Sequence, residues 1–314
     1  HSKSYPKFYG PLMTKMLFNR VAFIGMGLIG SSIARVIRRD KLANSIIACA
    51  RTDETLEAVV RLNIADETTK DVANAALDAD LVMICTPLST YGSIAQALGP
   101  VLKPGSIVSD VGSVKVSAIN SIKPHLPEGV HFVPGHPIAG TENSGPDAGF
   151  ESLFENRWLL LTPPEGTDQK AINQIRKLWE AAGSKVNCID PEHHDQVLAI
   201  TSHLPHLIAF TIVGTATDLE DDIKSEVIKY SASGFRDFTR IAASDPVMWR
   251  DIFISNREAV LEMLGRLSED LASLQRAIRV GDGAKLEALF RRTREIRRGV
   301  VEAGQHIPPS PRKN

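Results

Sequence analysis

One histidine stands in a turn whose neighbours suit an active site. His136 lies within Gly135-His136-Pro137-Ile138-Ala139-Gly140, directly after the apolar run from His131 to Val133. A dehydrogenase needs a group that takes the hydroxyl proton while hydride leaves carbon, and histidine performs this near neutral pH. The glycines leave room for substrate and Pro137 stiffens the loop. His136 is therefore the first candidate for a catalytic base, and a structural histidine in a turn is the alternative.

A glycine-rich turn predicts the cofactor. It follows the apolar strand Val21 to Ile24 and opens the helical run Ser31 to Arg38. In that context the first glycine permits a tight turn, the second lets a pyrophosphate approach the backbone, and the third lets helix and strand pack closely. The phosphates then face the helix N-terminus. We predict cofactor contacts from Gly25, Gly27, Leu28, Ile29 and Gly30.

The end of the second predicted strand bears on the choice of cofactor. An NAD enzyme usually carries an acid there for the ribose 2′-hydroxyl, whereas an arginine accommodates a 2′-phosphate. This chain has Arg51 and Thr52 at that point, which favours NADP. Asp53 keeps NAD open, because a small change of register would place it on the ribose. A surface role for Arg51 is a further alternative.

Two later strand ends should border the same crevice. Thr86 and Pro87 follow the apolar run Leu81 to Cys85, and Ser113 follows the run Ile107 to Asp110. Ligand crevices open at the carboxyl ends of parallel strands. We therefore expect Thr86 and Pro87 to lie beside the cofactor.

One cluster of residue types that could bind a metal does not have the spacing of a metal site. His193, His194 and Asp195 are consecutive but have no fourth partner at ligand spacing. We expect no metal site, and we interpret the three residues as the polar start of a helix.

The elements that must position these residues fall into two parts. Short β-rich runs alternate with helical segments from Met16 to about Asp190, which predicts a Rossmann-type, doubly wound parallel sheet. The predicted strands are Val21 to Ile24, Ile46 to Ala50, Leu81 to Cys85, Ile107 to Asp110, His131 to Val133, Trp158 to Leu161 and Val186 to Ile189.

After Pro191 the strand signals stop and the pattern is helical. A single helix is predicted from about Val247 to Val280, with apolar residues at alternating steps of four and three. Such a helix would be roughly 50 Å long, too long for a small domain to cover by itself, so an intersubunit contact is expected. The seam residues are Val260, Leu264, Leu267, Leu271, Leu274 and Ile278. A last helix is expected from Ala284 to about Arg298.

Composition limits the class of protein. The 314 residues are 43% hydrophobic and carry a formal net charge of -1, which argues against nucleic acid or a membrane surface as the main partner. No apolar stretch is expected to span a bilayer. Cys49, Cys85 and Cys188 lie in apolar runs and are expected to be buried, reduced thiols of a cytoplasmic protein. We predict three segments: a leader or expression remnant (1–15), a dinucleotide-binding domain (16–190) and a helical substrate and dimerisation domain (191–314).

Several separated motifs occur in the order seen in one enzyme family. They are Gly112-Ser113-Val114-Lys115, Gly135 to Glu142, Ser202-His203-Leu204-Pro205-His206, Asp237 to Ala242, and Trp249-Arg250-Asp251. With the glycine turn, the chain resembles the prephenate and arogenate (cyclohexadienyl) dehydrogenases of tyrosine biosynthesis from about Val21 to Asn256. The resemblance implies oxidative decarboxylation of prephenate or arogenate with NAD(P)+, by a homodimer whose product tyrosine is a possible inhibitor.

The resemblance also assigns roles to residues. His136 would accept the hydrogen bond of the ring hydroxyl, and Ser113 would share that bond and hold the histidine's orientation. Arg240 would hold a substrate carboxylate, for which a guanidinium fork is suited. His206, and with it His203, would lie near the substrate side chain, although core or capping roles are an equal alternative. Glu142 and Asp237 would gate access or orient the arginine, with ordinary surface roles equally open, whereas Trp249 is expected to pack in the core.

Two other classes of function would leave different marks in the sequence. Another two-domain reductase, of the 3-hydroxyacid or imino-acid type, would have a lysine base or a different substrate loop. A non-catalytic dinucleotide-sensing subunit would lack the proton acceptor or the carboxylate clamp, and both His136 and Arg240 are present. The sequence leaves open the choice between prephenate and arogenate.

Overall fold

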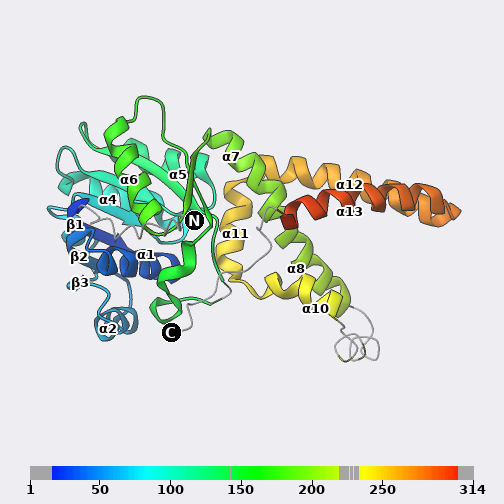
Figure 1. Cartoon of the computed structure of the whole chain (residues 1–314), viewed down its shortest axis with the longest axis horizontal. Helices are drawn as coiled ribbons and strands as arrows, with labels where there is room; N and C mark the ends of the chain where they lie inside the picture. The colour runs from blue at the N-terminus through cyan, green and yellow to red at the C-terminus, as the bar shows by residue number, and fades with distance from the viewer. Residues whose placement is uncertain (1–15, 142, 219–225, 227–228, 230–232, 303–314) are drawn as a thin grey trace, which may run out of the picture.

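The computed structural model describes residues 16–302 apart from 142, 219–225, 227–228 and 230–232. Residues 1–15 and the candidate Glu142 therefore lie outside the described part. A sheet domain forms one side of the molecule, and helices that follow it in the chain project from the other side (Figure 1). The expectation of a sheet domain followed by a helical domain is confirmed.

The sheet has eight strands in the order β3-β2-β1-β4-β5-β6-β7-β8. Its neighbours are parallel except for β6 and β7, which are antiparallel. The strands are β1 Phe18–Ile24, β2 Ala43–Cys49, β3 Glu67–Thr69, β4 Leu81–Ile84, β5 Ile107–Asp110, β6 His131–Pro137, β7 Trp158–Leu161 and β8 Lys185–Cys188.

Helices cover both faces of this sheet, as a doubly wound fold requires. One apolar core lies under α1 Leu28–Arg39, α2 Asp53–Arg61 and α6 Gln169–Ala181. The other lies under α3 Val72–Ala76, α4 Tyr91–Leu98 and α5 Lys115–Ile122. The central strands β4 and β5 are buried throughout, which explains why β4 consists of the uninterrupted apolar run Leu81–Ile84.

Two features of the sheet differ from the sequence prediction. The three-residue edge strand β3 was not predicted, because Glu67–Thr69 has neither an apolar run nor a clear alternation. The strand β7 was expected to be parallel to β6. The chain between these two strands contains only short 3-10 turns in its described part, so no helical crossover carries it back to the starting edge.

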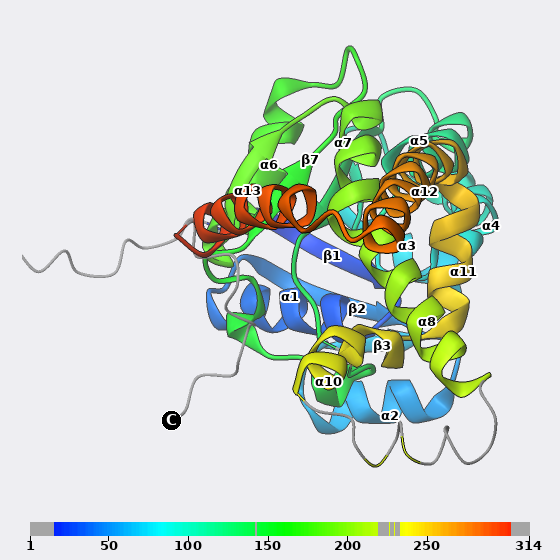
Figure 2. The same cartoon turned by 90° about the vertical axis from the view of Figure 1, so that its right-hand side faces the viewer.

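The helical domain begins at Pro191, three residues after β8. It contains α7 Pro191–Leu198, a π-helical turn Ala199–His203, α8 Leu204–Thr217, α10 Ser233–Thr239, α11 Pro246–Ser255, α12 Arg257–Val280 and α13 Gly283–Glu302. The helices α12 and α13 form a hairpin that extends away from the sheet domain (Figure 1), and Figure 2 shows this hairpin from its tip. The single helix expected from Val247 to Val280 is wrong, because Asn256 separates α11 from α12.

The helical run Pro191–Thr217 is more apolar than the sequence analysis allowed. Within its 27 residues an 18-residue window reaches a mean hydropathy of 1.6, and only 28% of that window is buried, so by length and composition it meets the criterion for a membrane span. The expectation that no stretch would do so was wrong. A helix that packs within a protein meets the same criterion, and this one carries His194, Asp195 and His203 in buried positions.

Candidate active site

The glycine turn has the geometry that a bound dinucleotide needs. Gly25 has φ +98°, and a Cβ there would lie 2.8 Å from the carbonyl oxygen of Cys85. A Cβ on Gly30 would lie 2.5 Å from the carbonyl oxygen of Gly25. A Cβ on Gly27 would instead meet nothing within 4 Å, so this glycine borders open space at the start of α1. The turn therefore fits a pyrophosphate at a helix N-terminus.

The carboxyl end of β2 carries the residues that would meet the adenosine ribose. Arg51 is exposed and has no hydrogen-bond or ion-pair partner among the described residues. Thr52 caps α2 by accepting a hydrogen bond from the backbone N–H of Thr55. Asp53 is the first residue of α2, and its carboxylate lies 2.7 Å from the ammonium of Lys70. Asp53 thus forms an ion pair with Lys70, which the sequence did not predict.

The loop after β4 borders the same edge. Thr86 is packed against the glycine turn, since its methyl group would lie 2.8 Å from a Cβ on Gly25. The Thr90 hydroxyl donates to the Thr86 hydroxyl at 2.8 Å, and Pro87 precedes a short 3-10 turn over Leu88–Thr90. Both predicted residues therefore lie at the carboxyl edge of the strands that flank the glycine turn.

His136 lies on a strand, not in the loop that the sequence analysis expected. The first half of β6 pairs with β5 and the second half pairs with β7, where His136 is opposite Leu160. Pairing with β7 extends the strand to Pro137, past the point where β5 ends. His136 is consequently fixed at the carboxyl edge of the sheet and is only 9% exposed.

A chain of hydrogen bonds fixes the orientation of this histidine. Nδ1 of His136 lies 2.9 Å from Nε2 of His194, and Nδ1 of His194 lies 2.8 Å from Oδ1 of Asp195. A carboxylate only accepts, so His194 must donate from Nδ1 and accept at Nε2, and His136 must donate from Nδ1. The Nε2 of His136 is then left with a lone pair, which is the form that a hydrogen-bond acceptor for a substrate hydroxyl requires.

Asp195 is itself fixed by the sheet domain. Its two oxygens accept hydrogen bonds from the backbone N–H groups of Lys115 and Val116, at 2.7 and 3.0 Å. These groups are at the N-terminus of α5, whose own preceding residue, Val114, makes no capping bond. A carboxylate from α7 therefore caps α5 and orients the histidine pair at the same time.

Burial keeps the site histidines neutral. The pKa of His136 lies well below its ordinary value because of burial, and the nearby positive charge of Lys115 lowers it further. Burial also lowers the pKa of His194, against the opposing hydrogen bond to Asp195, and it lowers the pKa of His203 to about 4. His136 therefore remains an acceptor at neutral pH.

A buried ion pair lies beneath the loop that carries Ser113. The Lys115 ammonium donates to Oδ2 of Asp110 and to the carbonyl oxygen of Gly135, both at 2.6 Å, and both charged side chains are fully buried. The Tyr91 hydroxyl and the Gly112 N–H donate to the same Asp110 oxygen. This network ties β5 to the residue before His136.

Trp249 joins His203 and His206 to the sheet domain. The ring of His206 stacks on Trp249 at a centroid distance of 3.7 Å, and the ring of His203 lies at 6.1 Å from it. The buried Asn256 contacts Nδ1 of His203 at 3.1 Å and donates to the carbonyl oxygen of Asp195 at 2.9 Å. Trp249 also packs in a small apolar cluster with Val114, which follows Ser113. The core role expected for Trp249 agrees with this burial.

Of the remaining predicted residues Arg240, Asp237 and Ser113, the structure places Arg240 near His206. Arg240 is exposed in the 3-10 turn after α10, and its charge lowers the pKa of His206, so the two side chains are near each other. Asp237 pairs at 3.4 Å with its neighbour Arg236. Ser113 makes no hydrogen bond to His136 in the described part, and the side chain that contacts Nδ1 of His136 is that of His194.

Three buried residues of this site were missed or misread in the sequence. His194 and Asp195 were interpreted as helix-start polarity, but only His193 fits that description, because it is exposed and its N–H is capped by Asp190. Lys115 was noted as part of a motif without a role. The signal that identifies His194 and Asp195 is their contact with β6 and α5, which are distant in sequence.

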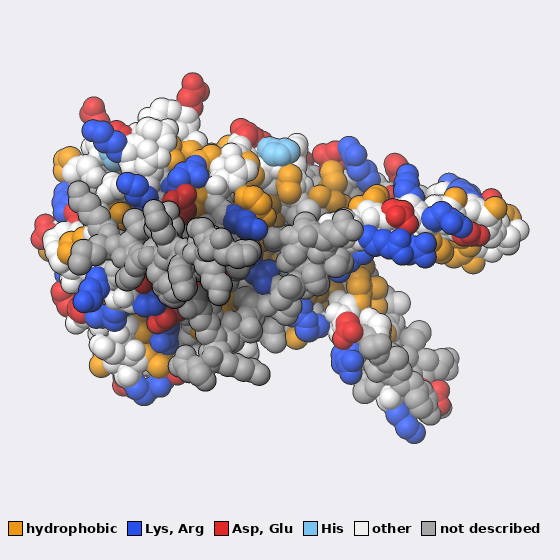
Figure 3. Space-filling model, in the orientation of Figure 1, with side chains coloured by type: hydrophobic (Ala, Val, Ile, Leu, Met, Phe, Trp, Pro, Cys, Tyr) orange, Lys and Arg blue, Asp and Glu red, His pale blue; other side chains and the backbone are white. Residues whose placement is uncertain are grey.

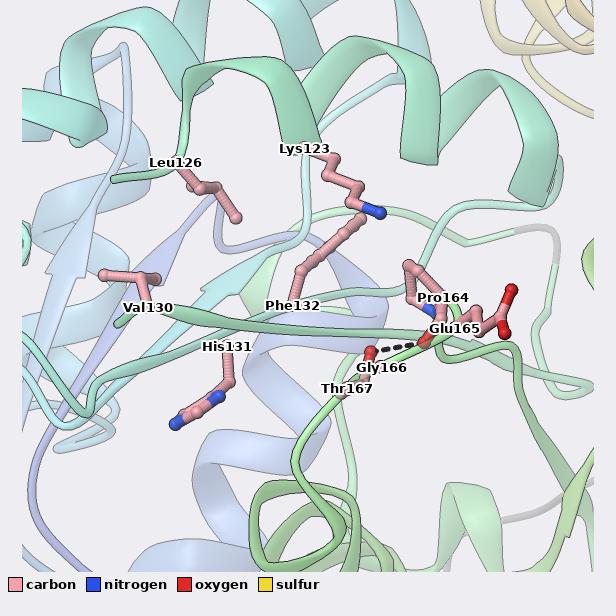
Figure 4. A pocket seen from close by; sticks show the side chains of 9 residues that line it. All are labelled: Lys123, Leu126, Val130, His131, Phe132, Pro164, Glu165, Gly166 and Thr167. Carbon is pink, nitrogen blue, oxygen red and sulfur yellow. Dashed lines mark hydrogen bonds between the residues drawn. The ribbon is translucent and has the colours of Figure 1, made fainter. Parts of the chain in front are cut away.

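The cavity of Figure 4 and the exposed Cys188 both lie outside the candidate active site. The cavity of about 230 Å³ in Figure 4 lies at the start of β6, beside His131 and the loop after β7, at the opposite end of the strand from His136. It is therefore not part of the candidate active site. All three cysteines are free, but Cys188 is exposed beside Arg176, so the expectation of three buried thiols is wrong.

A dinucleotide turn, an oriented neutral histidine at the same sheet edge and a second, helical domain beside it define a two-domain NAD(P)-dependent dehydrogenase. Two family models match: the prephenate dehydrogenase nucleotide-binding domain over residues 33–188 and the prephenate dehydrogenase dimerization domain over residues 190–292. The chain therefore belongs to the prephenate dehydrogenase family.

Individual relatives agree with this assignment. The chain is 41% identical to a cyclohexadienyl dehydrogenase of Zymomonas mobilis, over 90% of this chain and 96% of the relative. The Aquifex aeolicus prephenate dehydrogenase, solved with hydroxyphenyl propionate and NAD+, superposes with a TM-score of 0.84 at 34% identity, over 90% of this chain and 98% of that one. The Synechocystis arogenate dehydrogenase gives 0.76 at 30% identity, over 90% and 99%.

Proposed function

We propose that this chain catalyses the oxidative decarboxylation of prephenate, arogenate or both, with hydride transfer to NAD(P)+. The products are 4-hydroxyphenylpyruvate from prephenate and tyrosine from arogenate, together with carbon dioxide. The observation that carries this proposal is His136, held neutral with its Nε2 lone pair free at the edge of the sheet that binds the dinucleotide. Family membership and the names of the relatives support the same reaction.

The residues of this chain mainly orient the substrate. The nicotinamide supplies the hydride acceptor when the cofactor is bound. His136 accepts the hydrogen bond of the ring hydroxyl while the ring carbon loses hydride and the ring carboxylate leaves as carbon dioxide. The ring becomes aromatic, which drives the reaction, and the proton shared with His136 stays on the phenolic oxygen. Holding the hydroxyl in line is therefore the main catalytic task.

The anionic groups of the substrate would meet the helical domain. Arg240 is an exposed guanidinium beside His206, and we assign it one substrate carboxylate. His206, stacked on Trp249, and the buried His203 would line the side-chain pocket. Ser113, half-buried at the end of β5, would contact the ring hydroxyl beside His136. Glu142 and Asp237 would border the entrance.

We further propose that NADP is the preferred cofactor. Arg51 is exposed at the end of β2 without a partner among the described residues, where a 2′-phosphate would lie. Asp53, the residue that would favour NAD, is engaged by Lys70 at 2.7 Å. The complex of the Aquifex relative contains NAD+, so NAD remains the competing choice.

We also propose a cytoplasmic homodimer. The helical domain matches a dimerization-domain model, and large apolar side chains are exposed on it, among them Ile212 at 37%, Leu271 at 55% and Ile278 at 67%. Hydrophobic side chains are visible along α8 and the α12–α13 hairpin in Figure 3. A second copy would cover these faces. Three free cysteines are in keeping with a reducing compartment.

The decisive experiment is a steady-state comparison of prephenate and arogenate with NAD+ and NADP+. We expect turnover with at least one substrate, a higher kcat/KM with NADP+, and competitive inhibition by tyrosine, which resembles the substrate after aromatisation. No turnover with either substrate would overturn the proposed reaction. Inhibition that excess substrate does not relieve would contradict binding of tyrosine at the active site.

The role of His136 is tested by His136→Asn. Asparagine keeps a polar group but provides no imidazole acceptor, so kcat should fall by roughly a hundredfold or more. Binding of a non-reactive substrate analogue, measured by calorimetry, should persist, because His136 contributes mainly to the reacting state. Undiminished turnover would remove His136 from the mechanism.

A further inference from the structure

Lys70 lies where a cofactor-discriminating residue would be needed. It follows β3, which is parallel to β2 with Thr69 opposite Cys49. The backbone N–H of Ala50 donates to the carbonyl oxygen of Thr69 at 3.2 Å. The two chains therefore leave the sheet side by side, and Arg51 and Lys70 emerge at the same edge as the glycine turn.

The charges at this edge are arranged around one acid. Asp53 lies next to Thr52, at the start of α2, where its charge would repel a phosphate group bound at Arg51. The Lys70 ammonium lies 2.7 Å from the Asp53 carboxylate and compensates that charge. Both side chains are more than half exposed, at 51% and 71%. Exposed ion pairs contribute little to stability, so Lys70 can share its charge with a bound anion at small cost.

We propose that Lys70 is a specificity-determining residue for the dinucleotide: together with Arg51 it binds a phosphate on the adenosine ribose, and it compensates the repulsion from Asp53. A phosphate monoester dianion there would meet two cations and the positive end of α2 against one carboxylate. A ribose with a free 2′-hydroxyl offers no charge for either cation. This inference rests on the proposed preference for NADP and names the residue that the unpredicted strand β3 brings to the site.

The test uses two ligands that differ only in the 2′-phosphate. Binding of 2′,5′-ADP and of 5′-AMP is measured by calorimetry on the purified protein, with no turnover involved. The native protein should bind 2′,5′-ADP more tightly. Lys70→Met should weaken 2′,5′-ADP by roughly tenfold, as loss of one charge-assisted contact predicts, and change 5′-AMP less than about twofold.

Two further variants sharpen the result. Asp53→Asn should tighten 2′,5′-ADP and should recover part of the affinity that Lys70→Met loses, because it removes the repulsive charge. Lys170→Met is the matched control: it removes an exposed lysine from α6, which packs at the other end of the sheet, and should leave both affinities unchanged. Circular dichroism should show the same fold for each variant.

The outcomes separate this inference from the proposals on which it rests. If Lys70→Met leaves the preference for 2′,5′-ADP intact, Lys70 is not a specificity residue, although NADP use stands. If the native protein binds 5′-AMP as tightly as 2′,5′-ADP, the NADP preference and the role of Lys70 both fail. The dehydrogenase reaction is unaffected in either case, since it is measured with substrate turnover.

Discussion

The histidine pair His136–His194 is the centre of the site at the scale of single residues. The donor and the acceptor in each hydrogen bond of this pair follow from one constraint: the Asp195 carboxylate can only accept a hydrogen bond. Each histidine must then present its Nδ1 proton toward Asp195, and the free lone pair is on the side of His136 away from His194. One acid thus determines the tautomers of two histidines.

His194→Gln should reduce catalysis without removing the base. Glutamine cannot span the gap between His136 and Asp195 as an imidazole does, so His136 would lose its defined orientation. We expect kcat to fall by roughly a hundredfold, the scale of a small misplacement of a catalytic group, while KM changes little. His193→Gln is the control, because His193 is the exposed neighbour in the same helix. Equal effects of both changes would contradict the orienting role.

The pH dependence should reflect the lowered pKa of His136. Burial and neighbouring cations disfavour the protonated form, so the neutral acceptor persists below the ordinary histidine pKa of 6.5. Protonation would inactivate the base, and it occurs only at lower pH. A profile of kcat/KM should therefore stay flat from pH 8 to 6.5 and decline further down. A decline centred at or above pH 6.5 would show that His136 is not held neutral.

At the scale of elements, the loop from Val111 to Val114 lies on a buried polar network. A Cβ on Gly112 would lie 2.7 Å from the Tyr91 hydroxyl and 2.9 Å from Oδ2 of Asp110. Gly112 is therefore required by close approach and not by its φ. The loop carries Ser113, so a shift of this backbone would also shift a proposed substrate contact.

Gly112→Ala should destabilise the protein and slow turnover. The extra methyl group must displace a buried tyrosine or carboxylate, which we expect to cost about 1–3 kcal/mol in the free energy of unfolding. Gly92→Ala is the matched control: it lies in α4, and a Cβ there meets nothing within 4 Å. That change should be neutral or stabilising in urea unfolding, since alanine favours a helix. If Gly112→Ala leaves the free energy of unfolding unchanged, Tyr91 and Asp110 can move aside without cost and Gly112 is not required there.

The sequence predicted the elements with strong local patterns. Apolar strands such as Leu81–Ile84 and the glycine turn are encoded within a few residues, and the structure has them where expected. The edge strand Glu67–Thr69 and the extension of β6 through His136 arise from pairing with distant strands. Local patterns do not contain that information.

The same division explains the site. His136, Arg51 and Thr86 were predicted because motifs or strand ends mark them. His194, Asp195 and the proposed residue Lys70 were not predicted. Each is a candidate only because of the residue that it contacts, and that residue is distant in sequence. Asn256 interrupts the predicted long helix for a related reason: its side chain contacts Asp195 and His203, not its own helix terminus.

At the scale of the whole molecule, the helical domain carries more apolar surface than it covers. The α8 sequence is apolar on all sides, yet few of its residues are buried in one chain. A helix of this kind is normally enclosed. A second copy of the chain would enclose this helix. It would also cover the apolar seam of α12, for which the sequence predicts an intersubunit contact.

Ile212→Glu should weaken this assembly. A charge placed on the apolar face of α8 would have to be buried in the dimer, so we expect dissociation at concentrations where the native protein is dimeric. Light scattering after size exclusion measures the mass directly. Val60→Glu is the control, since Val60 is an apolar residue on α2 of the sheet domain and is more exposed than Ile212, at 61% against 37%. A dimer that survives Ile212→Glu would place the interface elsewhere.

The pairing of β6 with two different strands has a consequence for how the site responds to a movement of one domain against the other. Its first half belongs to the parallel sheet and its second half to the antiparallel pair with β7, so His136 shares one rigid frame with the glycine turn. Arg240 and His206 belong to the other domain. His194 and Asp195 are on α7, and Asp195 ties this helix to α5 of the sheet domain. An opening that leaves this contact intact would alter the capture of substrate while His136 kept its place and orientation at the sheet edge. Solvent viscosity should then act on substrate entry and product departure, and an inhibitor that spans both domains should dissociate far more slowly than one that contacts the sheet alone.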